Sequence, residues 1–251
     1  MKEQLLVLAK TYPSISHKYE HLVCVGGITD KKEWRRVYPI AWQIFWGGGF
    51  KKKYWIEYEK QNDERSDHRP ESRKINSKTI KELYEADFKD IKHILDDRLT
   101  TLENLTSRSH KEVSMGVIKP FKILDFIPEN NEHYEKLKEK QKQTSLSGKS
   151  VVQVDIFPKV FSYVFYCSPD CKTKHKIMCE DWELMALYRN CERLRKEGTY
   201  KDENEVFEKV KQRFLKELPN KRDLYFIVGT HYRFNTYLIV GVVYPRNSDV
   251  Y

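Results

Sequence analysis

The sequence lacks any apolar run near the roughly 20 residues that a membrane-spanning helix requires. Its first ten residues, MKEQLLVLAK, contain a short apolar stretch but no small-residue cleavage site, so no secretory signal peptide is predicted. We therefore expect a cytoplasmic protein that has no membrane partner.

Familiar nucleotide-binding and catalytic signatures are also missing. The triple glycine at 47–49 is followed neither by Lys-Ser/Thr nor by the helix start of a phosphate loop, so it predicts a flexible loop. The sequence contains no dinucleotide fingerprint, no Ser/His/Asp signature and no paired-carboxylate spacing. These absences exclude the simplest enzyme assignments and leave catalysis open.

Cysteine is scarce and odd in number: five residues in a chain of 251. A core of this size needs no disulfide for stability, and cytoplasmic thiols stay reduced. Three of the five fall between 167 and 179. Clustered thiols in a reducing compartment suggest a metal site before a disulfide.

What the chain does contain is charge and aromatic side chains. Charged residues make up 33% and aromatic residues 13%, a richness in aromatics that disordered chains lack. The net charge is +9, which favours an acidic partner, with nucleic acid ahead of a membrane surface. The alternative is a lysine-rich solvated surface, because 37 acidic residues are interspersed with the 46 basic ones.

The pattern of short apolar runs predicts an α+β fold: a mostly antiparallel sheet or small β-barrel with about three packed helices. Strands are expected at 4–9, 21–29, 33–42 and 54–60, with an exposed loop at 61–78. Helical periodicity marks 78–105, 180–196 and 202–218, and a terminal hairpin at 223–245 is apolar on both faces, as in a central position of a sheet. This hairpin could join the first strands.

We expect one integrated unit over 1–251. Within it, the pattern suggests a small barrel at 1–60, a helical and loop insertion at 61–150, and a metal knuckle, two helices and the hairpin at 151–251.

The candidate metal site is Cys-x₃-Cys-x₃-His-x₃-Cys, formed by Cys167, Cys171, His175 and Cys179. Thiolates and imidazole are the ligands that zinc takes in structural sites, although these intervals differ from those of common zinc modules. Pro169 argues against a helix through 167–171 and for a turn on which the sulfurs converge. Cys179 is the weaker ligand, since Cys24 or a carboxylate such as Asp181 could take the fourth position.

Acidic and imidazole side chains supply candidates for catalysis. Asp181 and Glu183 stand at a predicted helix start, where capping explains them without chemistry, but beside a metal they could activate water. The loop from Asp67 to Arg73, with His68, could hold a phosphate or reacting group, and His231 and Arg233 form a lesser candidate of this kind.

Two basic-aromatic clusters in the first sixty residues suggest a nucleic-acid face, because arginine binds phosphate bidentately and aromatic rings stack on bases. Lysine and arginine on edge strands are the alternative explanation. The candidate contacts, with the arginines of the 67–73 loop added, are Trp34, Arg35, Arg36, Tyr38, Lys51, Lys52, Lys53, Trp55, Arg69 and Arg73.

Several phrases together resemble an uncharacterised family of bacterial and archaeal proteins for which no activity is known to us. The matching phrases are Lys10–Pro13, Trp34–Pro39, Lys53–Ile56, Arg69–Ser72, Cys167/Cys171/His175, Asp181–Glu183 and Val228–Gly229. Thr173-Lys174 departs from the family, which tends to have glycine before the histidine. The resemblance implies one integrated unit and supports the choice of site, and it implies no activity.

Taken together, the sequence favours a nucleic-acid-binding protein with a zinc-type Cys/His site. The alternatives are a metal-dependent hydrolase acting on nucleic acid or a nucleotide, and a protein-interaction subunit of a larger assembly.

Overall fold

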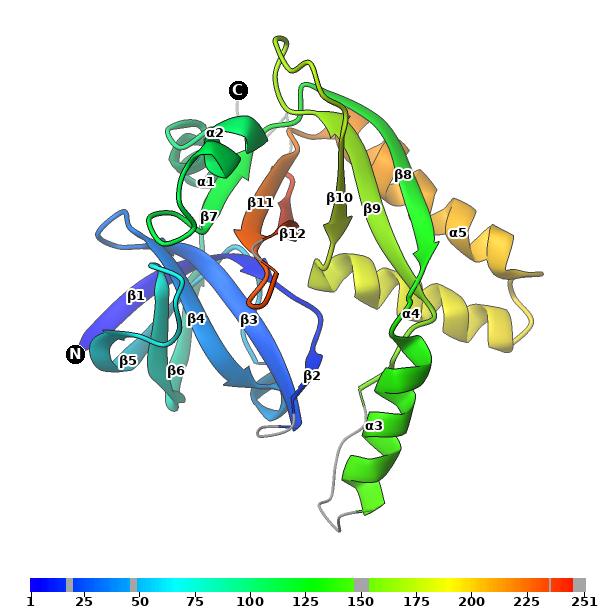
Figure 1. Ribbon diagram of the computed structural model, residues 1–251, viewed down its shortest axis with the longest axis horizontal. Helices are drawn as coiled ribbons and strands as arrows, with labels where there is room; N and C mark the ends of the chain where they lie inside the picture. Colours follow the sequence, from blue (N-terminus) through cyan, green and yellow to red (C-terminus); the bar gives the residue numbers. More distant parts are fainter. Residues whose placement is uncertain (17–19, 46–48, 147–153, 235, 246–251) are drawn as a thin grey trace.

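The structure is a computed structural model that describes residues 1–16, 20–45, 49–146, 154–234 and 236–245. Two six-stranded sheets form the body, with helices at the periphery (Figure 1). Both sheets are mixed but mostly antiparallel: β4 pairs with β6 and β10 with β12 in parallel, whereas the other strand pairs run antiparallel. The predicted α+β class is confirmed.

The first sheet closes on itself. Its strands are β1 (Lys2–Lys10), β2 (Ser14–Ser16), β3 (Glu20–Thr29), β4 (Trp34–Ala41), β5 (Tyr54–Arg65) and β6 (Ser72–Glu85). β1 pairs with both β5 and β3, so β1, β3, β4, β6 and β5 form a ring. Counting these five strands in chain order, the ring reads 1-2-3-5-4-1 with a parallel contact between the third and fifth strands, which is the topology of an OB barrel.

The closed barrel encloses an apolar core. It is lined by Val7, Val25, Val37, Ile56 and Tyr58, each fully buried, and side chains of the short helix η1 (Trp42–Phe45) pack against it. A Cβ on Gly27 would stand 1.9 Å from the Leu6 carbonyl oxygen, so only glycine allows β3 to approach β1 this closely. Of the predicted triple-glycine loop, Gly47 and Gly48 lie outside the described residues.

The helix predicted at 78–105 is wrong in its first part. The loop predicted at 61–78 is confirmed only for 66–71, because β5 runs to Arg65 and β6 begins at Ser72. Residues 72–85 form β6, and helices follow only at α1 (Phe88–Asp96) and α2 (Leu102–Ser107). The backbone of β6 pairs with β5, as at Ile56↔Glu82. Pairing with a distant strand therefore overrides the helical spacing of the apolar residues, since propensity is a weak prior against tertiary contacts.

The second sheet is open and lies beside the barrel. It consists of β7 (Met115–Ile118), β8 (Lys122–Asn130), β9 (Lys159–Tyr166), β10 (His175–Cys179), β11 (Tyr225–Thr230) and β12 (Tyr237–Val243), in the order β7-β11-β12-β10-β9-β8. The central position predicted for the terminal hairpin is confirmed, because β11 and β12 have neighbours on both sides. The idea that this hairpin joins the first strands is wrong.

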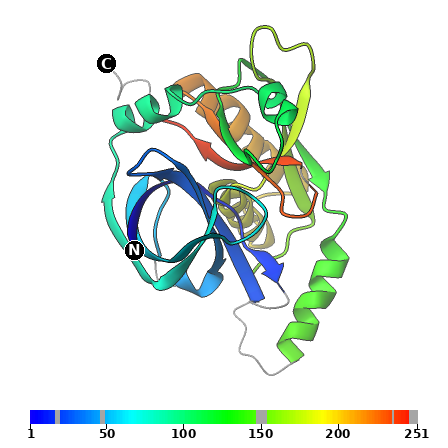
Figure 2. The same ribbon diagram turned by 60° about the vertical axis from the view of Figure 1, so that its left-hand side comes forward.

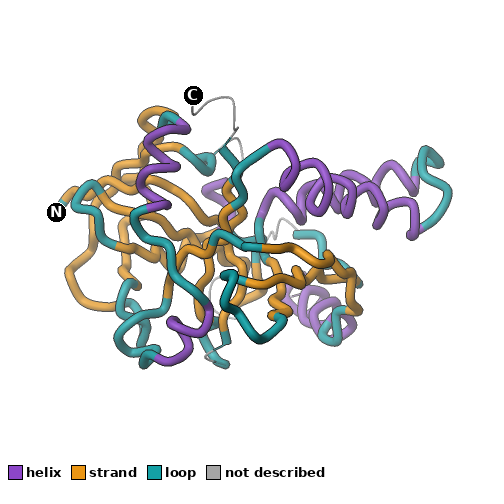
Figure 3. The backbone as a smooth tube through the Cα atoms, turned by 90° about the horizontal axis from the view of Figure 1, so that it is seen from above, coloured by secondary structure: helices purple, strands orange, loops and turns teal. Residues whose placement is uncertain are grey.

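Helices flank the second sheet. α4 (Trp182–Lys196) and α5 (Glu203–Lys211), which continues through a π-helical turn (Gln212–Glu217) into α6 (Leu218–Lys221), extend to one side in the view from above (Figure 3). They confirm the helices predicted at 180–196 and 202–218. α3 (Tyr134–Leu146) projects away from the body in Figures 1 and 2.

The two sheets share one apolar core. Leu6, Leu8 and Ile28 of the barrel pack with Val117 and Ile227 of the second sheet. A Cβ on Gly241 would stand 2.7 Å from the Leu8 carbonyl oxygen, so glycine lets β12 lie directly on β1. The barrel face formed by β1 and β3 is thus partly covered from within the chain. Among the described residues, no helix is long and apolar enough to cross a membrane.

Candidate metal centre and neighbouring surfaces

Four potential metal ligands meet where α2 approaches the turn between β9 and β10. Cys167 directly follows β9, and His175 opens β10 opposite Phe165. A turn closed by the Cys171 amide, which donates to the Ser168 carbonyl at 3.2 Å, brings Cys171 back toward both. The fourth member, Glu103, lies in the first turn of α2, whose N-cap Thr101 accepts from the Asn104 amide.

The donor atoms of Glu103, Cys167, Cys171 and His175 all lie within 4.8 Å of one another. The His175 Nε2 atom is 3.2 Å from the Cys171 Sγ atom and 3.6 Å from the Cys167 Sγ atom. In a tetrahedral zinc site with bonds of 2.0–2.3 Å, neighbouring donors are about 3.3–3.8 Å apart. The two sulfurs and the imidazole therefore fit a zinc-sized ion with little movement.

Glu103 is drawn into this group by hydrogen bonds. Its carboxylate accepts from Cys167 Sγ at 2.9 Å and from Cys171 Sγ at 3.1 Å, and lies 2.8 Å from His175 Nε2. Against the effect of burial, these thiol hydrogen bonds lower the pKa of Glu103 to about 2. Burial, and then the hydrogen bond to Glu103, raise the pKa of the Cys167 thiol to about 12. In this arrangement the Cys167 thiol holds a proton that an ion would displace.

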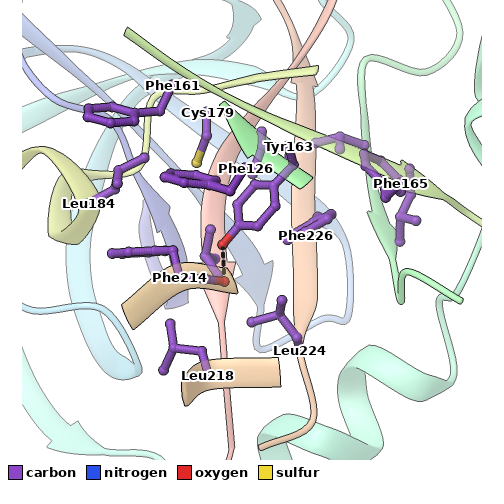
Figure 4. Close-up of a cluster of buried hydrophobic side chains, with 14 of the residues drawn as sticks. Phe126, Phe161, Tyr163, Phe165, Cys179, Leu184, Phe214, Leu218, Leu224 and Phe226 are labelled. Atoms are coloured by element: carbon purple, nitrogen blue, oxygen red, sulfur yellow. Dashed lines mark hydrogen bonds between the residues drawn. The ribbon is translucent and has the colours of Figure 1, made fainter. Parts of the chain in front are cut away.

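Cys179 is not brought to this group. It ends the β10 strand that His175 begins, and strands rise about 3.3 Å per residue, so about 13 Å of strand separates the two positions. Figure 4 shows Cys179 among Phe126, Phe161 and Leu184, and its side chain is 2% exposed. The even spacing in the sequence therefore reflects a turn for the first three residues and a strand for the last.

Two family models match the chain, and their boundary falls next to this site. A domain of unknown function, DUF8758, matches residues 1–99, and a second, DUF8757, matches residues 97–251. The chain belongs to the DUF8757 family. The predicted likeness to an uncharacterised family is confirmed. No curated protein and no solved structure matches the chain.

All four potential ligands lie in the DUF8757 part of the chain. The departure from the glycine-histidine pattern at Thr173-Lys174 needs no left-handed backbone, because every residue from 167 to 175 has a negative φ. The Thr173 carbonyl oxygen instead lies 3.0 Å from Cys171 Sγ and competes with Glu103 for the thiol hydrogen.

The acidic residues proposed for catalysis lie away from this group and have other partners. Asp181 caps α4 by accepting from the amides of Glu183 and Leu184, as the capping interpretation predicted. It also pairs at 2.6 Å with Lys52, whose ammonium lies 3.3 Å from Glu183. Both carboxylates thus bind a lysine of the DUF8758 part, in a buried contact between the barrel and α4. His68 is exposed on the barrel side.

Glu180, next to this contact, should make the stability of the protein depend on pH. Burial raises the pKa of the partly buried Glu180 carboxyl to about 7. The folded state then binds a proton more tightly than the unfolded state. The stability that Glu180 contributes through this proton is fully present below pH ~4.5 and is lost as the pH rises through ~7. The loss should be about 2 kcal/mol after discounting for partial exposure.

Urea unfolding of the wild type and of Glu180→Gln at pH 5 and pH 8 checks this expectation. The glutamine variant should lose less stability over this interval than the wild type. Parallel pH profiles for the two proteins would mean that Glu180 titrates normally.

Most residues proposed to contact nucleic acid have partners inside the protein. Arg35 makes a bidentate pair with Glu3 at 2.8 and 2.9 Å, and its side chain is 6% exposed. Arg69 forks onto Asp67 at 2.6 and 3.1 Å. Lys52 is buried, as is Arg36, which lies 3.3 Å from Cys24 Sγ. The charged clusters at these positions mainly hold the fold together.

The other candidates range from half-buried to exposed. Arg73 donates to the carbonyls of Pro70 and Ser72, and Lys53 lies over the rings of Phe88 and Tyr244. Trp34, Tyr38 and Trp55 are half-buried, and Lys51 alone among the ten candidates is exposed.

The structure does bring two of the weaker candidate loops together. The His68 ring lies 5.5 Å from that of Tyr232, and Arg69 Nη1 donates to the Thr230 carbonyl at 3.2 Å. The Arg69 guanidinium lies over the rings of both Tyr38 and Tyr232, 5.6 and 5.7 Å from their centroids. We call the set Tyr38, His68, Tyr232, Arg233 and Phe234 the junction surface.

Aromatic rings are exposed on the junction surface. Tyr232 is 50% exposed and Phe234 66% exposed, the latter stacked on His231 with ring centroids 4.9 Å apart. Burial, and then the charges of Arg69 and Arg233, lower the pKa of His231. Tyr232 and Phe234 were not singled out in the sequence, where their hairpin loop showed only the polar connection between two apolar strands.

Proposed function

We propose that the protein binds a zinc-type metal ion through Cys167, Cys171 and His175 of the β9–β10 turn, with Glu103 of α2 as the fourth ligand. The observation that carries this proposal is the convergence of four donor atoms from two separate segments within 4.8 Å. Two thiolates and an imidazole favour zinc among the common divalent ions. Because Cys167 and Cys171 must be reduced to bind the ion, a cytoplasmic location is part of the proposal.

Elemental analysis of the purified protein tests this proposal. We expect about one zinc per chain, removable by a strong chelator, with one or two additional thiols becoming reactive to Ellman's reagent once the ion is removed. Preparations that contain no stoichiometric transition metal, and that take up none when zinc is added under reducing conditions, would contradict it.

We further propose that the junction surface binds single-stranded nucleic acid. It combines exposed Tyr232 and Phe234 rings, on which bases can stack, with the exposed cation Arg233. In OB barrels the second and third strands and the loop between the fourth and fifth bind oligonucleotides, and Tyr38 and His68 lie on the third strand and in that loop. This analogy concerns the fold and supports only the location.

Positive charge extends from the junction surface toward α3. Burial, and then the charges of Arg233 and Lys136, lower the pKa of Lys140, so these three cations lie near one another. A concentration of like charge beside exposed aromatic rings suits a polyanion whose bases stack, and suits an apolar protein partner less well.

Replacing both Tyr232 and Phe234 by alanine should weaken binding of a fluorescent single-stranded oligonucleotide at least about tenfold, since each stacked base contributes about 1–3 kcal/mol. Arg233→Gln should lower the slope of log affinity against log salt by about 0.7. Fluorescence anisotropy at two salt concentrations measures both effects.

The matched control is Phe121→Ala, which removes another exposed phenylalanine, 60% exposed on the second sheet side. Wild-type protein that fails to bind DNA or RNA at low salt, or a double variant with unchanged affinity, would remove this proposal. Loss of binding in the Phe121 control as well would place the contact elsewhere.

A further inference from the structure

We infer that the metal centre is open to an outside ligand: Glu103 is a displaceable ligand, and an adjoining groove admits a small apolar molecule whose donor atom takes its place on the ion. This inference rests on the proposed metal binding and specifies what that same site does.

The four ligands differ in how firmly they are held. Cys167 is 5% exposed and packs in the main core cluster, and the His175 side chain is 10% exposed against the Phe165 ring. Glu103 is 48% exposed and is the one member that does not come from the β9–β10 turn. An exposed carboxylate on a short helix can swing into solvent with little loss of packing, whereas the buried thiol cannot.

A groove adjoins the ion site at Cys167, the one of the four ligands that lines it. It has a volume of about 480 Å³, within the range of small-molecule sites, and Cys167 itself forms part of its wall. Leu99, Pro120, Phe121 and Pro169 give it an apolar lining. Leu99 is 45% exposed and Phe121 60% exposed, so two large apolar side chains that the fold leaves uncovered border the entrance.

Hydroxyl side chains of Thr100, Thr101 and Ser168 also line the groove, and its one charged lining residue, Lys119, already has a partner. Its ammonium pairs with Asp223 at 2.8 Å and lies over the Tyr225 ring. The groove therefore offers apolar contact from Leu99, Pro120, Phe121 and Pro169, and it meets the ion site at Cys167. Together these features select an aromatic or aliphatic molecule that carries one metal-binding group. Three protein ligands plus an exchangeable fourth position are also the arrangement of catalytic zinc sites, in contrast to closed structural ones.

Cobalt-substituted protein tests this inference, because the visible bands of thiolate-bound cobalt report changes in coordination. We would titrate it with benzohydroxamate, which has a ring for the groove, and with acetohydroxamate, which has the same donor and no ring. Both should shift the bands while cobalt stays bound on gel filtration, and benzohydroxamate should bind about tenfold more tightly. Phe121→Ala should remove most of this difference.

Glu103→Gln and Glu103→Ala provide the second arm. Both should retain about one cobalt per chain and bind hydroxamate at least as tightly as the wild type, since no carboxylate competes for the position. Bands that do not respond at millimolar hydroxamate, equal affinity for the two hydroxamates, or loss of cobalt from both Glu103 variants would each overturn the inference. A protein that takes up no cobalt at all would instead remove the proposed metal binding itself, and this inference with it.

Discussion

Lys52→Met should destabilise the protein by about 3–5 kcal/mol, the range measured when one partner of a buried ion pair is removed. The Lys52 ammonium is 2% exposed, pairs with Asp181 at 2.6 Å and donates to the Val242 carbonyl at 3.0 Å. Methionine fills a similar volume but leaves a completely buried carboxylate without its cation. Against the effect of burial, Asp181 and Glu183 hold the pKa of Lys52 well above its usual value, so the lysine is charged at neutral pH.

Urea unfolding followed by circular dichroism measures this loss, and Lys51→Met is the matched control. Lys51 is the preceding residue, is exposed and makes no buried ion pair, so its replacement should change stability by less than about 0.5 kcal/mol. Equal unfolding midpoints for the two variants would show that the contact between the barrel and α4 contributes little. If Lys52 instead contacted nucleic acid, its variant would lose binding and keep its stability.

Cys171→Ser should reduce the bound metal from about one equivalent to nearly none. The Cys171 Sγ atom lies 3.2 Å from His175 Nε2, and serine is a poor ligand for zinc. This residue separates metal binding from packing better than Cys167 does, because Cys171 is only partly buried and Cys167 lies in the core. Elemental analysis of protein purified in reducing buffer checks the result.

Cys179→Ser is the informative comparison for this experiment. It should keep its metal and lose stability, because it places a hydroxyl among buried aromatic rings. A Cys179 variant without metal, or a Cys171 variant with a full equivalent, would mean that the ligands are not those that converge in this structure.

Local patterns predicted the metal site only in part. Cys167, Cys171 and His175 are close in sequence and share a turn that Pro169 forces, so their convergence could be predicted from spacing and turn chemistry. Glu103 precedes Cys167 by 64 residues in a segment without any metal-binding pattern. Its role follows from the packing of α2 beside the turn, which no local signal encodes.

The role of the basic clusters also could not be predicted from local sequence. Lys52 and Asp181 are 129 residues apart, and Arg35 and Glu3 are 32 apart. A run such as Trp34–Tyr38 has the same composition whether its arginines reach solvent or a buried carboxylate. Only the partner decides this, and the partner lies elsewhere in the chain.

The fold, too, was predicted from the sequence only in part. The periodicity of apolar residues was sufficient for the α+β class, the two long C-terminal helices and the two-sided apolar hairpin, because burial on one or both faces is written into each segment. It was not sufficient for 78–85, where apolar residues at helical spacing form a strand paired with β5. The sequence alone thus established the elements that bury their own side chains and the three ligands of one turn. Contacts between distant segments decided the closure of the barrel, the fourth ligand Glu103 and the junction surface. The free energy of such contacts depends on two segments at once, so neither segment's sequence predicts it alone.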